Sequence, residues 1–171
     1  MKNIRLLFIL LFPLISAWAQ QANPKEAFLE KWDNSKNYLL AIAEAMPEDY
    51  YDFMPTERQM SFEEQLIHIK GNMDWLSNQY FNAGMATREN IQIPDTKAEI
   101  LKLIGAAFDS TRDIIASASE ESLEETVEFF SGPKSRLQIL NLLQDHVTHH
   151  RGQLVVYLNL KEIKPPRYIG W

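Results

Sequence analysis

The apolar residues of this 171-residue chain recur at three- and four-residue spacing in four long stretches, and this period constrains the fold more than any other feature. Such a spacing places apolar side chains on one face of an α-helix, which must be buried against other helices. The stretches span about residues 24–46, 61–81, 96–119 and 134–161. Strand signals are weak, and residues 126–130 are the single short candidate. The pattern therefore predicts an all-α protein built as a four-helix bundle.

Local signals support the helix boundaries. Pro24 suits the first turn of the first helix. Ser61 with Glu64, and Thr96 with Glu99, have the spacing of a capping box, in which each residue satisfies a free backbone N–H of the other. A Pro-Pro pair ends the fourth stretch. The connections are long enough for crossovers, so the up-down order of the helices stays open.

The N-terminal segment has the features of a secretory signal peptide. It has a basic start at Lys2 and Arg5, an apolar run of about a dozen residues, and small residues at Ala17 and Ala19. The run is too short to cross a membrane. We expect a signal peptide over residues 1–19, cleaved after Ala19, and one domain over the remaining residues 20–171. The protein would then be exported, periplasmic or extracellular, with no stable membrane span after cleavage; the alternative is an uncleaved N-terminal anchor.

Composition narrows the chemistry available to this domain. Without Lys2 and Arg5 the chain keeps 15 basic and 23 acidic side chains, a net charge of about −8, and it has no basic patch. We therefore expect no nucleic-acid partner. The chain contains no cysteine, so a disulfide, a catalytic thiolate and a thiolate metal ligand are all excluded. Any metal must be held by histidine or carboxylate.

Three of the four histidines lie in the last helical stretch, and two of them can act together. His146 and His150 are one helical turn apart and project from the same, largely buried side. Neutral imidazole is the commonest metal ligand, so the pair is a candidate half-site. The spacing alone is a weak signal, because a buried histidine pair is also satisfied by ordinary hydrogen bonds.

The fourth histidine strengthens the metal hypothesis. His68 lies on the second predicted helix, at the border of its apolar stripe, with Glu64 and Asn72 one turn away and Gln65 nearby. All four histidines thus occupy two helices that are predicted to pack in one bundle. A border position fits a site that solvent or substrate can reach, and it also fits an ordinary exposed histidine.

Two segments resemble the DinB-like superfamily of four-helix-bundle metalloproteins. They are "MPEDYYDFMPTERQMSFEEQLIHI" and "DHVTHHRGQLVVYL", the latter followed by "IKPP", and the resemblance spans nearly the whole chain after residue 19. It implies that His68, His146 and His150 bind one divalent metal ion, with zinc or nickel the expected metals. It also suggests a homodimer. The chain departs from many members in carrying Asn159 where they have an arginine, and in its secretory N-terminus.

Several polar residues are candidates for contacts around these ligands. Asp145 or Glu64 could accept the remaining imidazole N–H that metal-bound histidines usually donate, although a solvated surface carboxylate is the simpler reading of each. His149 is expected beside the ligands, as a proton relay or an exposed side chain. Further pocket candidates are Asn72 and Gln153. Of the neighbouring residues, Arg151 is expected to pair on the surface and Gly152 to permit close helix approach.

Two classes of function remain open on this reading. The first is a metal-dependent hydrolase or transferase acting on a small molecule, because three protein ligands leave a coordination position free. The second is a metal- or small-ligand-binding module without turnover. No catalytic residue beyond the ligands follows from the sequence. A helical bundle with hydrogen-bonded histidines and no metal is the remaining alternative.

Overall fold

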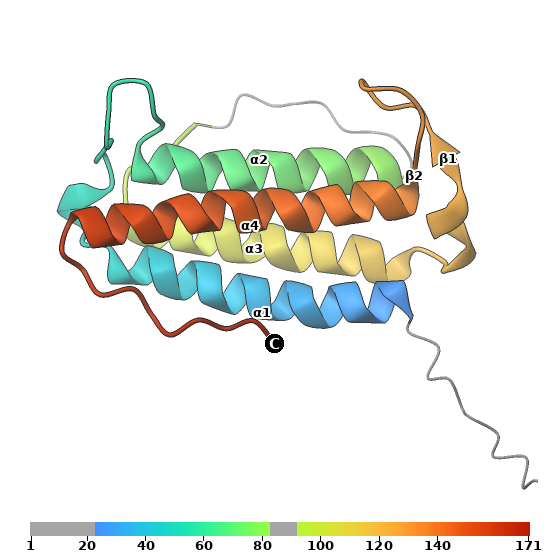
Figure 1. Ribbon diagram of the computed structural model, residues 1–171, viewed down its shortest axis with the longest axis horizontal. Helices are drawn as coiled ribbons and strands as arrows, with labels where there is room; N and C mark the ends of the chain where they lie inside the picture. The colour runs from blue at the N-terminus through green and yellow to red at the C-terminus, as the bar shows by residue number, and fades with distance from the viewer. Residues whose placement is uncertain (1–22, 83–91) are drawn as a thin grey trace, which may run out of the picture.

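The computed structural model describes residues 23–82 and 92–171, and this part of the chain forms the predicted four-helix bundle (Figure 1). The helices are α1 (Pro24–Ala45), α2 (Phe62–Phe81), α3 (Lys97–Ser117) and α4 (Arg136–Leu160). Each agrees with its sequence prediction to within two residues at either end. Residues 1–19, the predicted signal peptide, lie outside the described residues. None of the described helices is both long and apolar enough to cross a membrane.

The helices do not follow an up-down-up-down order. Helix α2 packs against α3 and α4, and α1 packs against the same two helices. In Figure 1, α2 and α3 run in one direction while α1 and α4 run in the other. Helix α3 therefore begins at the end of the bundle where α2 begins, and α2 and α4 are antiparallel neighbours. The long connections had left this crossover open.

Side-chain caps explain where two of the helices begin. The Ser61 hydroxyl accepts the N–H of Glu64, and the Glu64 carboxylate accepts the N–H of Ser61, which confirms the predicted capping box of α2. At α3 only half of the predicted box forms. Thr96 Oγ1 accepts the N–H of Glu99, while the Glu99 carboxylate accepts the Thr96 hydroxyl hydrogen instead of a backbone N–H.

Helix α4 has a capping box that the sequence analysis did not include. Ser135 is its N-cap and exchanges hydrogen bonds with Gln138. Ser135 also ends a short antiparallel hairpin, in which β1 (Thr126–Val127) pairs with β2 (Lys134–Ser135). The predicted strand over residues 126–130 is thus only two residues long. Gly132 adopts a φ of 96° in the intervening turn, a conformation that favours glycine.

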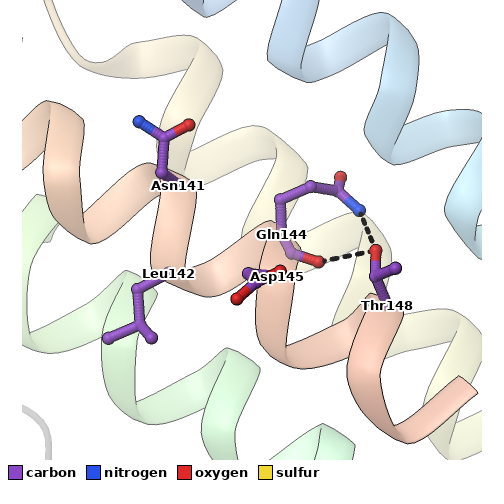
Figure 2. Close-up of a pocket in the computed structure, with 5 residues that line it drawn as sticks. All are labelled: Asn141, Leu142, Gln144, Asp145 and Thr148. Atoms are coloured by element: carbon purple, nitrogen blue, oxygen red, sulfur yellow. Dashed lines mark hydrogen bonds between the residues drawn. The ribbon is translucent and has the colours of Figure 1, made fainter.

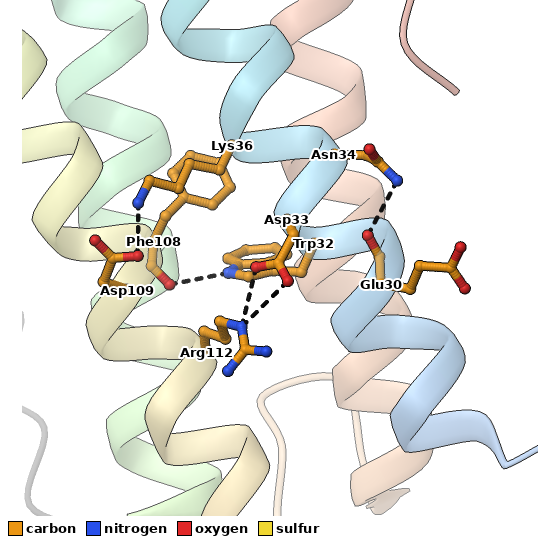
Figure 3. Close-up of polar contacts among 8 residues, drawn as sticks. All are labelled: Glu30, Trp32, Asp33, Asn34, Lys36, Phe108, Asp109 and Arg112. Carbon is orange, nitrogen blue, oxygen red and sulfur yellow. Dashed lines mark hydrogen bonds and ion pairs between the residues drawn. The ribbon is translucent and has the colours of Figure 1, made fainter. Parts of the chain in front are cut away.

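The core lies between the four apolar stripes, and one aromatic contact ties α1 to α3. Trp32 is 1% exposed, packs on the ring of Phe108, and donates its indole N–H to the Phe108 carbonyl oxygen over 3.1 Å. Figure 3 shows this bond beside two ion pairs between the same helices, Arg112–Asp33 and Lys36–Asp109. The ion pairs are partly exposed and therefore contribute little, so the buried apolar contacts hold the helices together.

Two local predictions on α4 were wrong. Arg151 is buried against α1, 4% exposed, with its guanidinium 5.1 Å from the centre of the Tyr38 ring, and does not pair on the surface. Gly152 is exposed, and a side chain added there would meet nothing within 4 Å, so it permits no close helix approach. Both errors share one cause: the rotation of α4 about its axis is set by packing against α1 and α2.

Candidate metal centre

Helices α2 and α4 bring the three predicted ligands together. His68 projects from α2, and His146 and His150 project from successive turns of α4, which runs antiparallel to it. One ring nitrogen from each histidine lies within 4.8 Å of the other two. Within the described ranges this is the one group of three or more histidines and carboxylates that could hold a metal ion.

The nitrogen atoms have a separation suited to a shared ion. His68 Nε2 and His146 Nε2 are 3.1 Å apart, within the range of about 3–3.5 Å expected for two ligands with metal–nitrogen bonds of about 2.1 Å. The three ring centroids are 4.4–4.9 Å apart, and the rings are tilted against one another. The rings therefore surround a common point and are not stacked face to face.

The environment of the two α4 ligands favours the neutral imidazole. Burial, together with smaller contributions from repulsion by the charged forms of the neighbouring histidines, lowers the pKa of His146 to about 3. Burial, followed by His68 and His149, lowers the pKa of His150 to about 4. Both rings are therefore unprotonated near neutral pH, which is the form that binds a metal.

The outer nitrogen of His150 contacts a glutamine that the sequence analysis had only noted as a neighbour. His150 Nδ1 lies 2.6 Å from Gln65 Oε1, and Gln65 is 3% exposed. The Gln65 amide nitrogen donates to Gln153 Oε1 over 2.6 Å, and the Gln153 amide nitrogen lies 2.9 Å from His149 Nε2. A continuous line of polar contacts thus runs from the half-buried His150 to the exposed His149.

The same glutamine is linked through Tyr157 to the backbone just before the start of α2. Its amide nitrogen lies 3.4 Å from the Tyr157 hydroxyl, which donates to the Met60 carbonyl oxygen over 2.8 Å. A signal for Gln65 was present in the sequence, because positions 65 and 68 share a helix face. What the sequence lacked was the pairing of that face with Gln153 and Tyr157 on α4.

The two carboxylates proposed as imidazole partners are placed elsewhere. Glu64 is exposed and caps α2, so the acceptor that His150 requires is Gln65 instead. Asp145 is exposed and lines a surface pocket of about 360 Å³ on α4 (Figure 2). None of the three clustered histidines lines that pocket. Both carboxylates are exposed, as the simpler reading of each expected, and the oxygen beside His150 Nδ1 belongs to Gln65.

The other candidates remain close to the ligands. Gln153 joins Gln65 to His149, whose ring centroid is 4.9 Å from that of His150 but which does not belong to the ligand cluster. Asn72 lies one turn beyond His68, and its Oδ1 is buried without a hydrogen-bond partner among the described residues. His146 Nδ1 is buried without a described partner as well.

The residues present fit a divalent metal ion. Three converging imidazoles, two of them held neutral by burial, form the nitrogen donor set that zinc and nickel accept. Three ligands also leave at least one coordination position for a small molecule.

Known proteins share both the sequence pattern and the fold. The family model of the DinB family matches residues 19–167. The uncharacterized protein YjoA of Bacillus subtilis (strain 168) is 26% identical over 126 residues, which are 72% of this chain and 81% of that protein. The crystal structure of YjoA, a DinB-like protein, superimposes with a TM-score of 0.71 at 20% identity, covering 84% of this chain and 97% of that one. A DinB-like protein from Bacillus cereus ATCC 10987 gives a TM-score of 0.73 at 15% identity, with 84% and 96% covered.

Proposed function

We propose that this chain, which belongs to the DinB family, binds one divalent metal ion through His68, His146 and His150. The observation that carries the proposal is the convergence of these three ring nitrogens within 4.8 Å, across two helices and 78 to 82 positions of sequence. Zinc and nickel are the metals we expect, because imidazole nitrogen suits both.

We further propose that the site acts on a small molecule as a metal-dependent hydrolase or transferase. A divalent ion held by three imidazoles supplies Lewis acidity, which lowers the pKa of a bound water or thiol and stabilises developing negative charge. The chain's own contribution is to present His146 and His150 as half-buried, neutral ligands, with the exposed His149 beside them. His149 is thereby placed to exchange a proton with solvent.

A metal- or ligand-binding module without turnover is the alternative function. The enzyme and the binding module differ at the coordination position that the histidines leave free. An enzyme holds an exchangeable water there, whereas all positions of a structural site are filled by fixed ligands. Nuclear-relaxation measurements of water exchange on a paramagnetic ion bound at the site distinguish them. Exchange on a fast timescale supports chemistry, and its absence supports binding alone.

Metal binding is expected to persist at mildly acidic pH. Three imidazoles of ordinary pKa would lose about a thousandfold in affinity between pH 7.5 and 5.5, because each must release a proton to bind. A histidine with a lowered pKa is protonated only at lower pH, so protons compete less with the metal for it. For His146 this competition begins as the pH falls toward about 3, and for His150 toward about 4. We therefore expect a loss far smaller than this thousandfold value.

Competition titrations with a zinc chelator at the two pH values measure this loss. The same titration at pH 7.5 tests the site itself, with the expected stoichiometry of one ion per chain. Absence of binding at pH 7.5 would refute the proposed function. Binding with a thousandfold loss at pH 5.5 would leave the site in place but contradict the burial-induced lowering of the two pKa values.

Export is a separate proposal that rests on the N-terminal sequence. Cleavage after Ala19 is expected to leave a mature chain that begins at Gln20, because Ala17 and Ala19 are the small residues that a signal peptidase accepts. Intact mass and N-terminal sequencing of the protein recovered from the exported fraction measure the cleavage point. A full-length product retained in the membrane would contradict cleavage and support the N-terminal anchor.

A further inference from the structure

Gln65 is a nearly fully buried amide that makes all its described polar contacts to α4. Its oxygen lies 2.6 Å from His150 Nδ1, and its nitrogen lies 2.6 Å from Gln153 Oε1 and 3.4 Å from the Tyr157 hydroxyl. An amide has one accepting and one donating end. The orientation of this amide therefore decides which kind of hydrogen bond His150 can make.

A backbone carbonyl determines that orientation. The Met60 carbonyl oxygen can only accept a hydrogen bond, so the Tyr157 hydroxyl hydrogen is directed to it over 2.8 Å. The Tyr157 oxygen can then act only as a hydrogen-bond acceptor toward Gln65. The end of the Gln65 amide that faces Tyr157 must be its NH₂ group, and the carbonyl end must face His150.

The reverse orientation would leave two acceptors in contact. If the Gln65 amide were turned around, its oxygen would face the lone pairs of Tyr157 within a buried site. An unsatisfied buried acceptor costs about 1–3 kcal/mol. As placed, Gln153 Oε1 accepts a hydrogen bond from the Gln65 amide nitrogen, which agrees with this orientation.

The direction of these hydrogen bonds determines which nitrogen of His150 faces the metal site with a lone pair. With the Gln65 oxygen as its neighbour, His150 Nδ1 must carry the proton of the neutral ring. The lone pair is then on Nε2, the other ring nitrogen. His150 Nδ1 is engaged by Gln65, which leaves Nε2 as the nitrogen that can join the His68 and His146 ligands.

We propose that Gln65 is a positioning residue that holds His150 in the Nδ1–H tautomer, with Tyr157 and the Met60 carbonyl setting the direction of its amide. The proposal rests on the proposed function in one respect, namely that the Nε2 lone pair serves a metal ion. Metal-binding histidines commonly need such an outer acceptor, and its loss typically weakens metal binding by 10- to 100-fold. Here a side-chain amide supplies the acceptor.

The tautomer itself is the most direct readout, and it requires no metal. Long-range ¹H–¹⁵N spectra of the metal-free full-length protein at pH 7.5 distinguish protonated from unprotonated imidazole nitrogens. The His150 signals are those absent from the His150→Ala variant. We expect Nδ1 protonated and Nε2 unprotonated in the wild type, and a mixture of both tautomers in Gln65→Met, which keeps the side-chain length and removes the acceptor.

Two further variants separate positioning from packing. Gln65→Glu retains an acceptor toward His150, so it should preserve the Nδ1–H tautomer and bind zinc within tenfold of the wild type, whereas Gln65→Met should bind 10- to 100-fold more weakly. Gln144→Met is the matched control, because the described hydrogen bonds of Gln144 go to Ser35 and Thr148 and not to a histidine. It should change neither the tautomer nor the zinc affinity.

The outcomes can be told apart. A wild-type His150 protonated at Nε2, or a Gln65→Met variant with unchanged tautomer, overturns the proposal even if zinc binds as expected. A wild type with the Nδ1–H tautomer that binds no metal refutes the proposed function while the positioning role of Gln65 stands. If Gln65→Met does not fold by circular dichroism, the wild-type tautomer and the Gln65→Glu variant still decide the question.

Discussion

Replacing His150 with alanine is expected to abolish tight metal binding while leaving the bundle folded. His150 supplies one of three converging ring nitrogens, and two imidazoles on different helices are a poor chelate. We expect the zinc affinity to fall by more than about a hundredfold, beyond the 10- to 100-fold typical of losing an outer contact. Any hydrolase or transferase activity found with the wild type should disappear as well.

The cost of this change in folding stability should be modest. A metal bound to the folded state at 100 times its dissociation constant adds about 2.7 kcal/mol, and this increment is what the variant loses. The apolar core does not depend on the ligand, because 27 buried residues from all four helices and the adjoining segments form one cluster. The metal-free wild type and His150→Ala should therefore melt at similar temperatures, and only the wild type should gain stability on adding zinc.

His149→Ala is the matched control for His150→Ala. His149 is exposed, lies next to His150 and contacts Gln153, but it is not part of the ligand cluster. Metal stoichiometry, thermal melting and activity should be measured on both variants. Equal loss of metal in the two would show that the ligands on α4 are wrongly assigned. Unfolding on chelation, or in His150→Ala, would show that the site is structural and remove the main support for an enzyme.

Replacing Trp32 with alanine is expected to cause the largest loss of stability of any change considered. The Trp32 side chain is 1% exposed and packs between Phe28 and Phe108. Truncation to alanine leaves a cavity that the surrounding helices can fill only in part, at a cost of about 3–5 kcal/mol. It also leaves the Phe108 carbonyl oxygen without its indole donor. Urea unfolding monitored by circular dichroism measures the change.

Two tryptophan variants calibrate this result. Trp171→Ala removes a side chain that is 71% exposed and contacts Lys31, so it should cost no more than about 1 kcal/mol. Trp32→Phe keeps much of the packing and removes the indole N–H. Its loss of folding stability should therefore lie between those of Trp171→Ala and Trp32→Ala. A Trp32→Ala variant as stable as Trp171→Ala would mean that the α1–α3 interface does not hold the bundle together.

The sequence by itself determined the four helices, because the information needed is local. The three- and four-residue spacing of apolar side chains selects a helix and its buried face without reference to the rest of the chain. Ser61 and Glu64 are only three positions apart, so the cap of α2 could also be read directly. The i, i+4 spacing of His146 and His150 placed two ligands on one side of α4 for the same reason.

His68 required more than local information. Its distance from the other histidines in the chain carries no spatial meaning, and the resemblance to the DinB-like superfamily supplied the link. The structure brings it to within 3.1 Å of His146. The expectation that it lies at the edge of the apolar stripe agrees with its partly exposed position on α2.

Only the tertiary structure decided how the helices are rotated and aligned against one another. Rotation of α4 buried Arg151 beside Tyr38, and the antiparallel alignment of α2 with α4 set Gln65 against His150, 85 positions away. Glu64, the residue before Gln65 on α2, forms the cap with Ser61 instead. Helical periodicity gives each side chain a direction relative to its own axis. Which partner it meets depends on the packing of two axes, and that is set by the whole core at once.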